Sequence, residues 1–133
     1  MVLKALVLLS LLITQRCAAQ AACATTCFEL DCRVMTIRYG KYCGVGHTGC
    51  KGEKPCDGVD GCCKIHDECV VKNNVLDNKC HSEFITCLKR QQASKRKGFS
   101  KKCPLSVVIP TMENGIIAAM AMGNLVKGFS DEL

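Results

Sequence analysis

The sequence contains no tryptophan, and its aromatic side chains are limited to two tyrosines and four phenylalanines. A chain of 133 residues is long enough for one domain and too short for two. It has no internal repeat and no low-complexity linker, which agrees with a single domain. A small core with so few large aromatic residues is hard to stabilise by apolar burial alone, so we expect covalent cross-links.

The N-terminus lacks an apolar run of the roughly 20 residues that a bilayer-spanning helix needs. Lys4 is followed by a shorter apolar run from Ala5 to Ile13 and then by small residues around Ala19. This order is typical of a secretory signal peptide and argues against a transmembrane anchor. We therefore expect residues 1–19 to be removed, with cleavage as late as residue 21, and residues 20–133 to form the domain.

Cysteine is abundant, with 13 residues, but no two of them form the Cys-x-x-Cys pair that zinc modules use. Cys17 lies in the expected signal peptide, so the exported domain keeps an even set of 12. An even set at this density in an exported chain predicts a framework of up to six disulfides and not a metal–thiolate site.

Acidic residues are absent from the stretch after Cys87, where basic residues gather. These are Lys89, Arg90, Lys95, Arg96, Lys97, Lys101 and Lys102. Loss of Lys4 and Arg16 with the signal peptide lowers the formal net charge from +6 to +4. The basic run is either a solvated helix end and loop or an interfacial surface that attracts phospholipid headgroups. Export and the scarcity of aromatic residues to stack on bases argue against nucleic acid as a partner.

Glycine is concentrated between Tyr39 and Gly61, which predicts mainly loop there. The segment from Cys23 to about Arg38 has a mixed pattern, in which we expect a short helix. We expect helices at residues 60–73, 77–91 and 111–125, with Asp60, Asp77 and Thr111 as their N-caps. The chain is thus expected to be mainly α.

The cysteine spacing predicts how the first two helices pair. Cys62 and Cys69 are two turns apart and lie on one face, as do Cys80 and Cys87. If the helices are antiparallel, Cys62 meets Cys87 and Cys69 meets Cys80, which joins them by two disulfides. His66 lies between these cross-links and faces the partner helix.

The segment from Tyr39 to Gly46 has glycine at alternate positions around Cys43. Glycine allows the backbone turns that bring successive carbonyl oxygens together, and calcium accepts such oxygens readily. Asp67, next to His66, can supply the negative charge of such a site. The alternative is that these glycines only make turns and that His66 is packed between the helices.

These residues match a known family. The string Tyr39-Gly40-x-Tyr42-Cys43-Gly44-x-Gly46, followed by Asp60-x-Cys62-Cys63-x-x-His66-Asp67-x-Cys69, resembles the secreted phospholipases A2. The short length and the 12 remaining cysteines are more similar to the plant branch than to the animal one. The resemblance implies a phospholipase A2-like fold, in which two antiparallel disulfide-linked helices lie beside a glycine-rich calcium loop.

The resemblance also implies the roles of single residues. Calcium would be bound by backbone oxygens of Tyr42, Gly44 and Gly46 and by Asp67, and His66 would be the general base. The Gly44 N–H would stabilise the oxyanion. The reaction would hydrolyse the sn-2 ester of phospholipids in a membrane or vesicle and release a free fatty acid and a lysophospholipid. The implied disulfides are Cys43–Cys63, Cys62–Cys87 and Cys69–Cys80.

The chain departs from the animal pattern at three positions. His81, followed by Ser82, stands where an aspartate orients the catalytic histidine, so His81, Ser82 or a water molecule is expected in that role. Val70 replaces a tyrosine, and Lys41 replaces a cysteine. The pairing of the other cysteines is therefore open, because six cysteines allow 15 pairings. They are Cys23, Cys27, Cys32, Cys50, Cys56 and Cys103.

The C-terminal tail is apolar but interrupted by Pro110, Glu113 and Asn114, so we expect no membrane span and expect Ile116, Ile117 and Met120 to pack on the core. Residues 130–133, Ser-Asp-Glu-Leu, resemble the retrieval signal of the endoplasmic reticulum. If the signal is read, the retrieval receptor is a partner and part of the protein is retained. Otherwise we expect a secreted monomer.

The alternative function is a non-catalytic, disulfide-rich protein that binds lipids or a receptor. A plant lipid-transfer protein would have a Cys-x-Cys element and eight cysteines, and this chain lacks that element and exceeds that number. An EF-hand is excluded because Asp57-Gly58-Val59-Asp60 breaks the ligand order of that loop.

Overall fold

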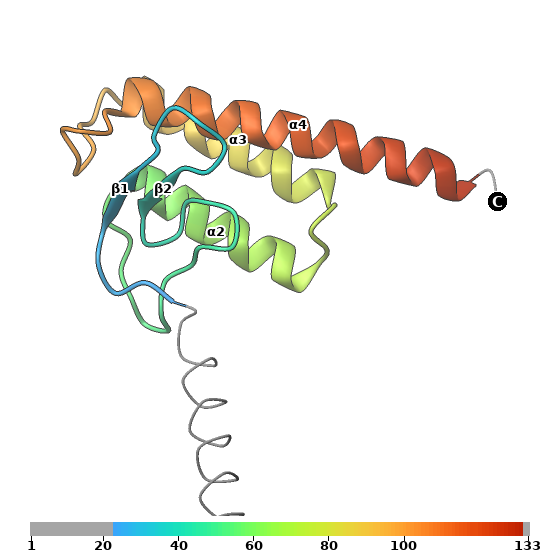
Figure 1. The fold of residues 1–133 in the computed structure, drawn as a ribbon, viewed down its shortest axis with the longest axis horizontal. Helices are drawn as coiled ribbons and strands as arrows, with labels where there is room; N and C mark the ends of the chain where they lie inside the picture. Colours follow the sequence, from blue (N-terminus) through green and yellow to red (C-terminus); the bar gives the residue numbers. More distant parts are fainter. Residues whose placement is uncertain (1–22, 132–133) are drawn as a thin grey trace, which may run out of the picture.

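A computed structural model describes residues 23–131 (Figure 1). The expected signal peptide and the last two residues of the tail lie outside this range. The described part contains a two-stranded antiparallel sheet and three helices. The elements are β1 (Phe28–Leu30), β2 (Arg38–Gly40), α2 (Gly58–Lys72), α3 (Asn78–Ala93) and α4 (Leu105–Asp131). The expected short helix before Tyr39 is wrong, because that segment forms β1 and turns, with Glu29 opposite Tyr39 across the sheet.

Helix α2 begins earlier than the sequence predicts. Its N-cap is Asp57, whose Oδ1 accepts a hydrogen bond from the Asp60 N–H at 3.0 Å, so the prediction of Asp60 as the cap is wrong. Asp60 lies in the first turn, and its fully buried carboxylate binds backbone N–H groups of the preceding loop instead. The helix ends at Lys72 with Asn73 as its C-cap, close to the expected end.

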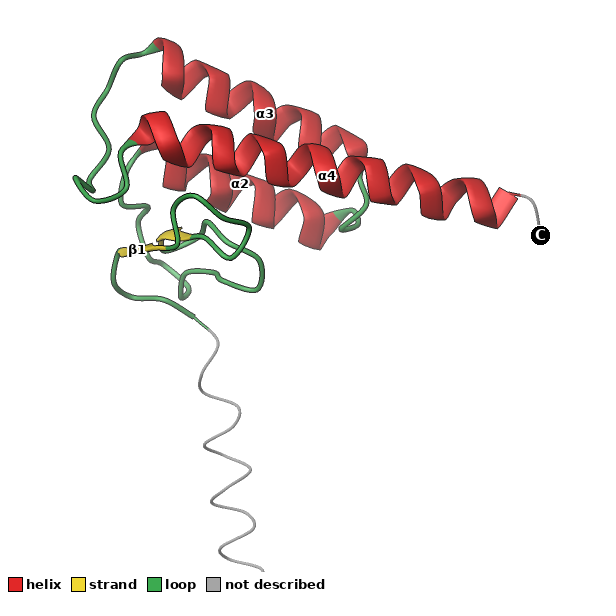
Figure 2. Ribbon diagram, turned by 45° about the horizontal axis from the view of Figure 1, so that its top comes forward, coloured by secondary structure: helices red, strands yellow, loops and turns green. Residues whose placement is uncertain are grey.

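Helix α3 begins as predicted. Asp77 is its N-cap and accepts from the Cys80 N–H at 3.0 Å. The disulfides Cys62–Cys87 and Cys69–Cys80 join α3 to α2, each with 5.7 Å between its Cα atoms. The two helices lie side by side, and α4 runs lengthwise along α3 (Figure 1, Figure 2). The two disulfides prevent α2 and α3 from sliding along each other, which fixes the side chains that lie between them.

Helix α4 begins at Leu105, so the predicted start at Thr111 is wrong. The carbonyl of Pro104 accepts from the N–H groups of Val107 and Val108 at 2.9 and 3.1 Å, and Pro110 lies inside the helix. Proline usually breaks a helix because it lacks an N–H. Here the first turn is held by burial of Val108 and Ile109, and this packing outweighs the local preference.

The remaining cysteines form Cys23–Cys50, Cys27–Cys56 and Cys32–Cys103, which resolves the pairing that the sequence left open. With Cys43–Cys63 and the two disulfides between α2 and α3, the described residues hold six disulfides. The core that they surround includes Tyr39, Val59 and Leu88, all fully buried. The predicted fold class is confirmed: a mainly helical, disulfide-rich domain built on two antiparallel, cross-linked helices.

The C-terminal part of α4 extends beyond the ends of α2 and α3, as both views show (Figures 1 and 2). Ile116 and Met120 are partly buried, as expected, whereas Ile117 is 55% exposed. Within residues 23–131, α4 is long and apolar enough to cross a membrane by length and composition alone.

Candidate functional site

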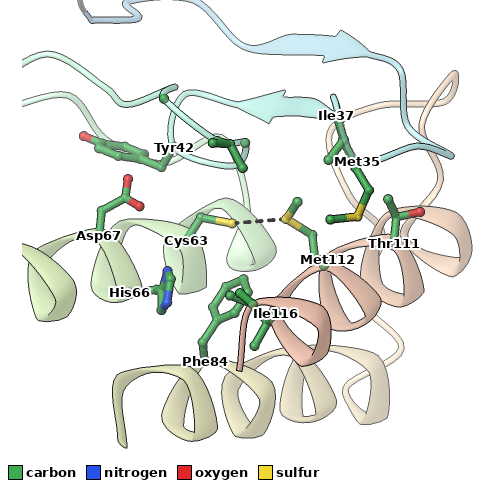
Figure 3. Close-up of a pocket in the computed structure, with 15 residues that line it drawn as sticks. Met35, Ile37, Tyr42, Cys63, His66, Asp67, Phe84, Thr111, Met112 and Ile116 are labelled. Carbon is green, nitrogen blue, oxygen red and sulfur yellow. Dashed lines mark hydrogen bonds between the residues drawn. The ribbon is translucent and has the colours of Figure 1, made fainter. Parts of the chain in front are cut away.

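A cavity of about 230 Å³ opens between the glycine-rich loop and the three helices. His66 and Asp67 from α2 line it together with Tyr42, Gly44 and Gly46 from the loop. The rest of the wall is mostly apolar and includes Met35, Ile37, Phe84, Met112 and Ile116. Figure 3 shows the carboxylate of Asp67 pointing toward the loop that carries Tyr42, and the ring of His66 pointing toward Phe84.

His66 is held from the side of α3. Its Nε2 lies 2.9 Å from Nδ1 of His81, and its ring lies 4.7 Å from the Phe84 ring, measured between centroids. His81 is buried, with 3% of its surface exposed. Burial, together with the neighbouring His81, lowers the pKa of His66 to about 4. The ring of His66 is therefore neutral at physiological pH and able to accept a proton.

Of the two side chains expected beside His66, only His81 reaches it. Ser82 is exposed, and its hydroxyl donates to the Asn78 carbonyl at 2.8 Å. His81 points inward because it lies one residue after Cys80, whose disulfide to Cys69 turns this face of α3 toward α2.

Asp67 carries an unusual buried oxygen. Its Oδ2 has no hydrogen-bond partner among residues 23–131, although it is shielded from solvent. The pKa of Asp67 is raised to about 7, mainly by burial and also by the negative charges of Asp60 and Glu68, while a hydrogen bond from Thr48 acts in the opposite direction. A carboxylate with a buried, unpartnered oxygen is costly to ionise unless a cation binds to it.

The loop from Tyr42 to Gly46 has the backbone shape that its glycines predict. Gly44 and Gly46 have φ angles of +133° and +68°, which side-chain-bearing residues rarely adopt. A Cβ at Gly44 would also collide with the carbonyl oxygen of Ile37. Hydrogen bonds within the described part of the chain leave the carbonyls of Tyr42 and Gly46 free, and that of Gly44 accepts only one, from His47 at 3.1 Å.

Asp60 positions this loop, a role that the sequence interpretation missed. Its carboxylate accepts from the Tyr42 and Cys56 N–H groups, both at 2.8 Å, and from the Lys41 N–H at 3.0 Å. Lys41, which stands at a cysteine position of the animal enzymes, makes an ion pair with Glu53 instead of a disulfide. The disulfide Cys43–Cys63 then ties the loop to α2, one turn before Asp67.

The oxygen donors fit calcium. Three backbone carbonyls and one carboxylate would give the hard, oxygen-only ligand set that calcium prefers, and a cation bound by Asp67 would neutralise its unpartnered Oδ2. No cluster of three or more His, Cys, Asp or Glu side chains that could hold a metal occurs between residues 23 and 131. A site with a single side-chain ligand would not form such a cluster.

The basic residues expected at an interface lie elsewhere. Lys89 and Arg90 are in the last turns of α3, and Lys95, Arg96 and Lys97 follow in the connection to α4. None of them lines the cavity that contains His66. They are exposed, and their role at a membrane stays a prediction.

Several wall residues had no local sequence signal. Met35 and Ile37 belong to irregular backbone and follow no helical period. Met112 and Ile116, four residues apart on α4, could have been found from their helical spacing, since residues four apart share a face.

Taken together, these features define a class of protein. A small, disulfide-braced helical domain presents a histidine and a carboxylate at one side of an apolar cavity, as an esterase for apolar substrates requires.

The comparisons with known proteins give the family. No family model matches the chain. Phospholipase A2-beta of Arabidopsis thaliana is 45% identical over 122 residues, which cover 87% of this chain and 83% of that protein. A rice (Oryza sativa) phospholipase A2 structure superposes with a TM-score of 0.72 at 32% identity and covers 81% of this chain and 90% of that one. A second structure of the rice enzyme, a complex with octanoic acid, gives a TM-score of 0.70 at 30% identity, over 81% of this chain and 96% of that one.

The chain therefore belongs to the plant phospholipase A2 family and is a phospholipase A2. Its substrate is a lipid, and enzymes of this family are generally calcium-dependent.

Proposed function

We propose that this enzyme hydrolyses the sn-2 ester of phospholipids with calcium as its cofactor, releasing a free fatty acid and a lysophospholipid. One observation carries the proposal: His66 and Asp67, adjacent on α2, line the same apolar cavity as the loop from Tyr42 to Gly46. The crystallised complex of the rice relative with octanoic acid, a fatty acid, supports a product of this class.

The carbonyl oxygens of Tyr42, Gly44 and Gly46 and the carboxylate of Asp67 would hold the calcium ion. When bound, calcium would supply positive charge that stabilises the oxyanion of the ester carbonyl. The Gly44 N–H would donate a hydrogen bond to the same oxygen, and preorganised donors of this kind typically contribute about 3–4 kcal/mol.

His66 would move the proton. Its Nδ1 would take a proton from a water molecule while the water oxygen forms a bond to the ester carbonyl carbon. The protonated ring would then give this proton to the leaving oxygen of the lysophospholipid as the ester bond breaks. The low pKa of His66, about 4, keeps the ring neutral and ready for the first step at physiological pH.

His81 would orient the base. If the Nε2–H of His66 donates to Nδ1 of His81, the Nδ1 lone pair of His66 is left for the water. A histidine in this place has no negative charge and would stabilise the protonated ring of His66 less than an aspartate does, so it would act mainly by fixing the tautomer and the ring position.

The disulfides support a location in the secretory pathway. Six disulfides fit the oxidising secretory pathway, and the family is consistent with that location. We propose partial retention in the endoplasmic reticulum through residues 130–133, of which residues 132 and 133 lie outside the described range. Identical export of an internally tagged protein with and without Leu133 would exclude this.

The direct test is fatty acid release from phosphatidylcholine vesicles whose two acyl chains differ. We expect release of the sn-2 acid with calcium and none with excess chelator. His66→Ala should lower turnover by about 10²–10⁴-fold. The matched control is Ile65→Ala, which changes an exposed neighbour on α2 and should leave turnover unchanged. Turnover that survives His66→Ala or chelation would overturn the proposal.

A further inference from the structure

The face of α4 that lines the cavity continues beyond it. Gly115 and Ala119 line the cavity, and Met122, Val126 and Phe129 follow at spacings of three and four residues, which keeps them on the same face. Every residue in this row is apolar or glycine. At about 1.5 Å per residue, the row from Gly115 to Phe129 is roughly 21 Å long.

The outer part of this row has no cover in the molecule. Met122 is 68% exposed, Val126 54% and Phe129 71%. Gly123, which packs near Leu76, is the last buried residue of α4. Beyond it the helix extends away from α2 and α3 (Figures 1 and 2). Large exposed apolar rows are rare on proteins that have no partner for them, and they mark binding surfaces.

Two other exposed residues that line the cavity are apolar as well. Val45, in the glycine-rich loop, is 90% exposed, and Met35, which lies against α4 near Gly115, is 56% exposed. Exposed apolar side chains from the loop and from beside α4 therefore flank the opening through which an acyl chain would enter.

Charge is nearly absent from the same part of α4. Between Asn114 and Ser130 the sequence has no acidic residue, and Lys127 is its single basic one. Up to Ser130 this part of α4 has no acidic side chain to repel phosphate, and Lys127 can contact it; the acidic Asp131 is the last residue of the helix.

We propose that the outer part of α4 lies flat in the surface of a phospholipid bilayer, with Met122, Val126 and Phe129 inserted among the acyl chains. Val45 from the glycine-rich loop and Met35 beside α4 enter the lipid as well, so the mouth of the cavity opens directly into lipid. Membrane binding of a helix in this position strengthens with the apolar area that it buries in the lipid and with the attraction of its basic groups to anionic lipids. The inference rests on the proposed function, because it delivers the phospholipid to that cavity.

A transmembrane arrangement does not fit the fold. The start of α4 is fixed by the disulfide Cys32–Cys103 and by the buried Val108 and Ile109. The free part after Gly123 is about 12 Å long, far short of the roughly 30 Å hydrocarbon core.

The absence of tryptophan allows a clean spectroscopic test. Phe129→Trp places a single reporter in the proposed surface, and Ile117→Trp places one on the opposite side of α4, where residue 117 is also exposed. Chelator is present in both cases to prevent hydrolysis. Vesicles of phosphatidylcholine with phosphatidylglycerol should shift the Phe129→Trp emission to the blue, and lipids brominated on their acyl chains should quench it. The Ile117→Trp emission should change little.

A binding measurement completes the test. Val126→Gln with Phe129→Gln should weaken sedimentation with the same vesicles by about tenfold or more, whereas Ile117→Gln with Ala121→Gln should change it by less than twofold. Hydrolysis of a short-chain phosphatidylcholine below its micelle concentration should be similar in all three proteins. Three results would overturn the proposal. They are equal quenching at positions 117 and 129, unchanged vesicle binding, and a blue shift without lipid, which would show that two copies pair through this row. Loss of hydrolysis with intact vesicle binding would instead refute the proposed catalytic function.

Discussion

Replacing Asp60 by asparagine should destabilise the protein and weaken calcium binding together. The side chain keeps its shape, but one carboxylate oxygen becomes an NH₂ group that cannot accept a hydrogen bond. Because Oδ1 serves Tyr42 and Oδ2 serves Cys56, either orientation of the amide leaves at least one of these N–H groups without an acceptor.

The size of the effect follows from burial. Asp60 is 0% exposed, so water cannot replace the lost acceptor. A hydrogen bond to a charged group contributes about 1.5–3 kcal/mol, and a buried donor left alone costs about 1–3 kcal/mol. We expect the free energy of unfolding to fall by about 2–4 kcal/mol. The calcium dissociation constant should rise at least about fivefold, because the loop that carries the Tyr42 carbonyl is no longer held.

Urea denaturation of the oxidised protein, followed by circular dichroism, measures the first effect, and calcium titration calorimetry measures the second. The matched control is Asp77→Asn, which changes the N-cap of α3, away from the loop. Asparagine and aspartate cap helices about equally well, so this variant should resemble the wild type. An Asp60→Asn protein with wild-type stability and calcium affinity would refute the assigned role of this carboxylate.

Four further predictions follow from the site and its supports. His81→Ala should lower kcat by about 10–100-fold, less than His66→Ala, with little change in calcium affinity; equal losses in the two variants would mean that His81 does more than orient the base. Gly44→Ala should abolish calcium binding measured by calorimetry while the helices persist by circular dichroism, because a Cβ there meets the Ile37 carbonyl and φ is +133°. The acid limb of the pH–rate profile should depend on calcium: burial raises the pKa of Asp67 to about 7, so protons compete with the cation as pH falls below 7, whereas His66, with a pKa of about 4, stays neutral there. Raising calcium should move that limb to lower pH, and a limb that ignores calcium would contradict this assignment. Replacing both Cys69 and Cys80 by serine should cost about 3 kcal/mol in urea denaturation, as expected for removal of a short disulfide loop, and an unchanged urea midpoint would show that this cross-link is not needed.

The helix pair and its two disulfides could be predicted because their information is local. Cysteines seven residues apart fix one face of a helix, and the Asp77 cap depends only on the next three residues. The position of His66 between the disulfides follows from the same spacing.

Other features depend on distant partners and could not be predicted. The carboxylate of Asp60 binds residues 18 and 19 positions earlier, so the sequence indicated only its capping preference. The start of α4 was misplaced because Pro110 and Thr111 suggest a helix start locally, while burial of Val108 and Ile109 extends the helix past them. The pairing of Cys32 with Cys103 joins residues 71 positions apart, so no local pattern indicates it.

The central claim is that the Asp67 carboxylate and the loop carbonyls form one calcium site beside His66. Calcium titration calorimetry of the wild type, Asp67→Asn and Glu68→Gln tests it most directly, since Glu68 is an exposed acid one residue away. The account predicts binding of one calcium ion by the wild type and by Glu68→Gln, and loss of this binding in an Asp67→Asn protein that remains folded. Undiminished binding by Asp67→Asn would contradict it.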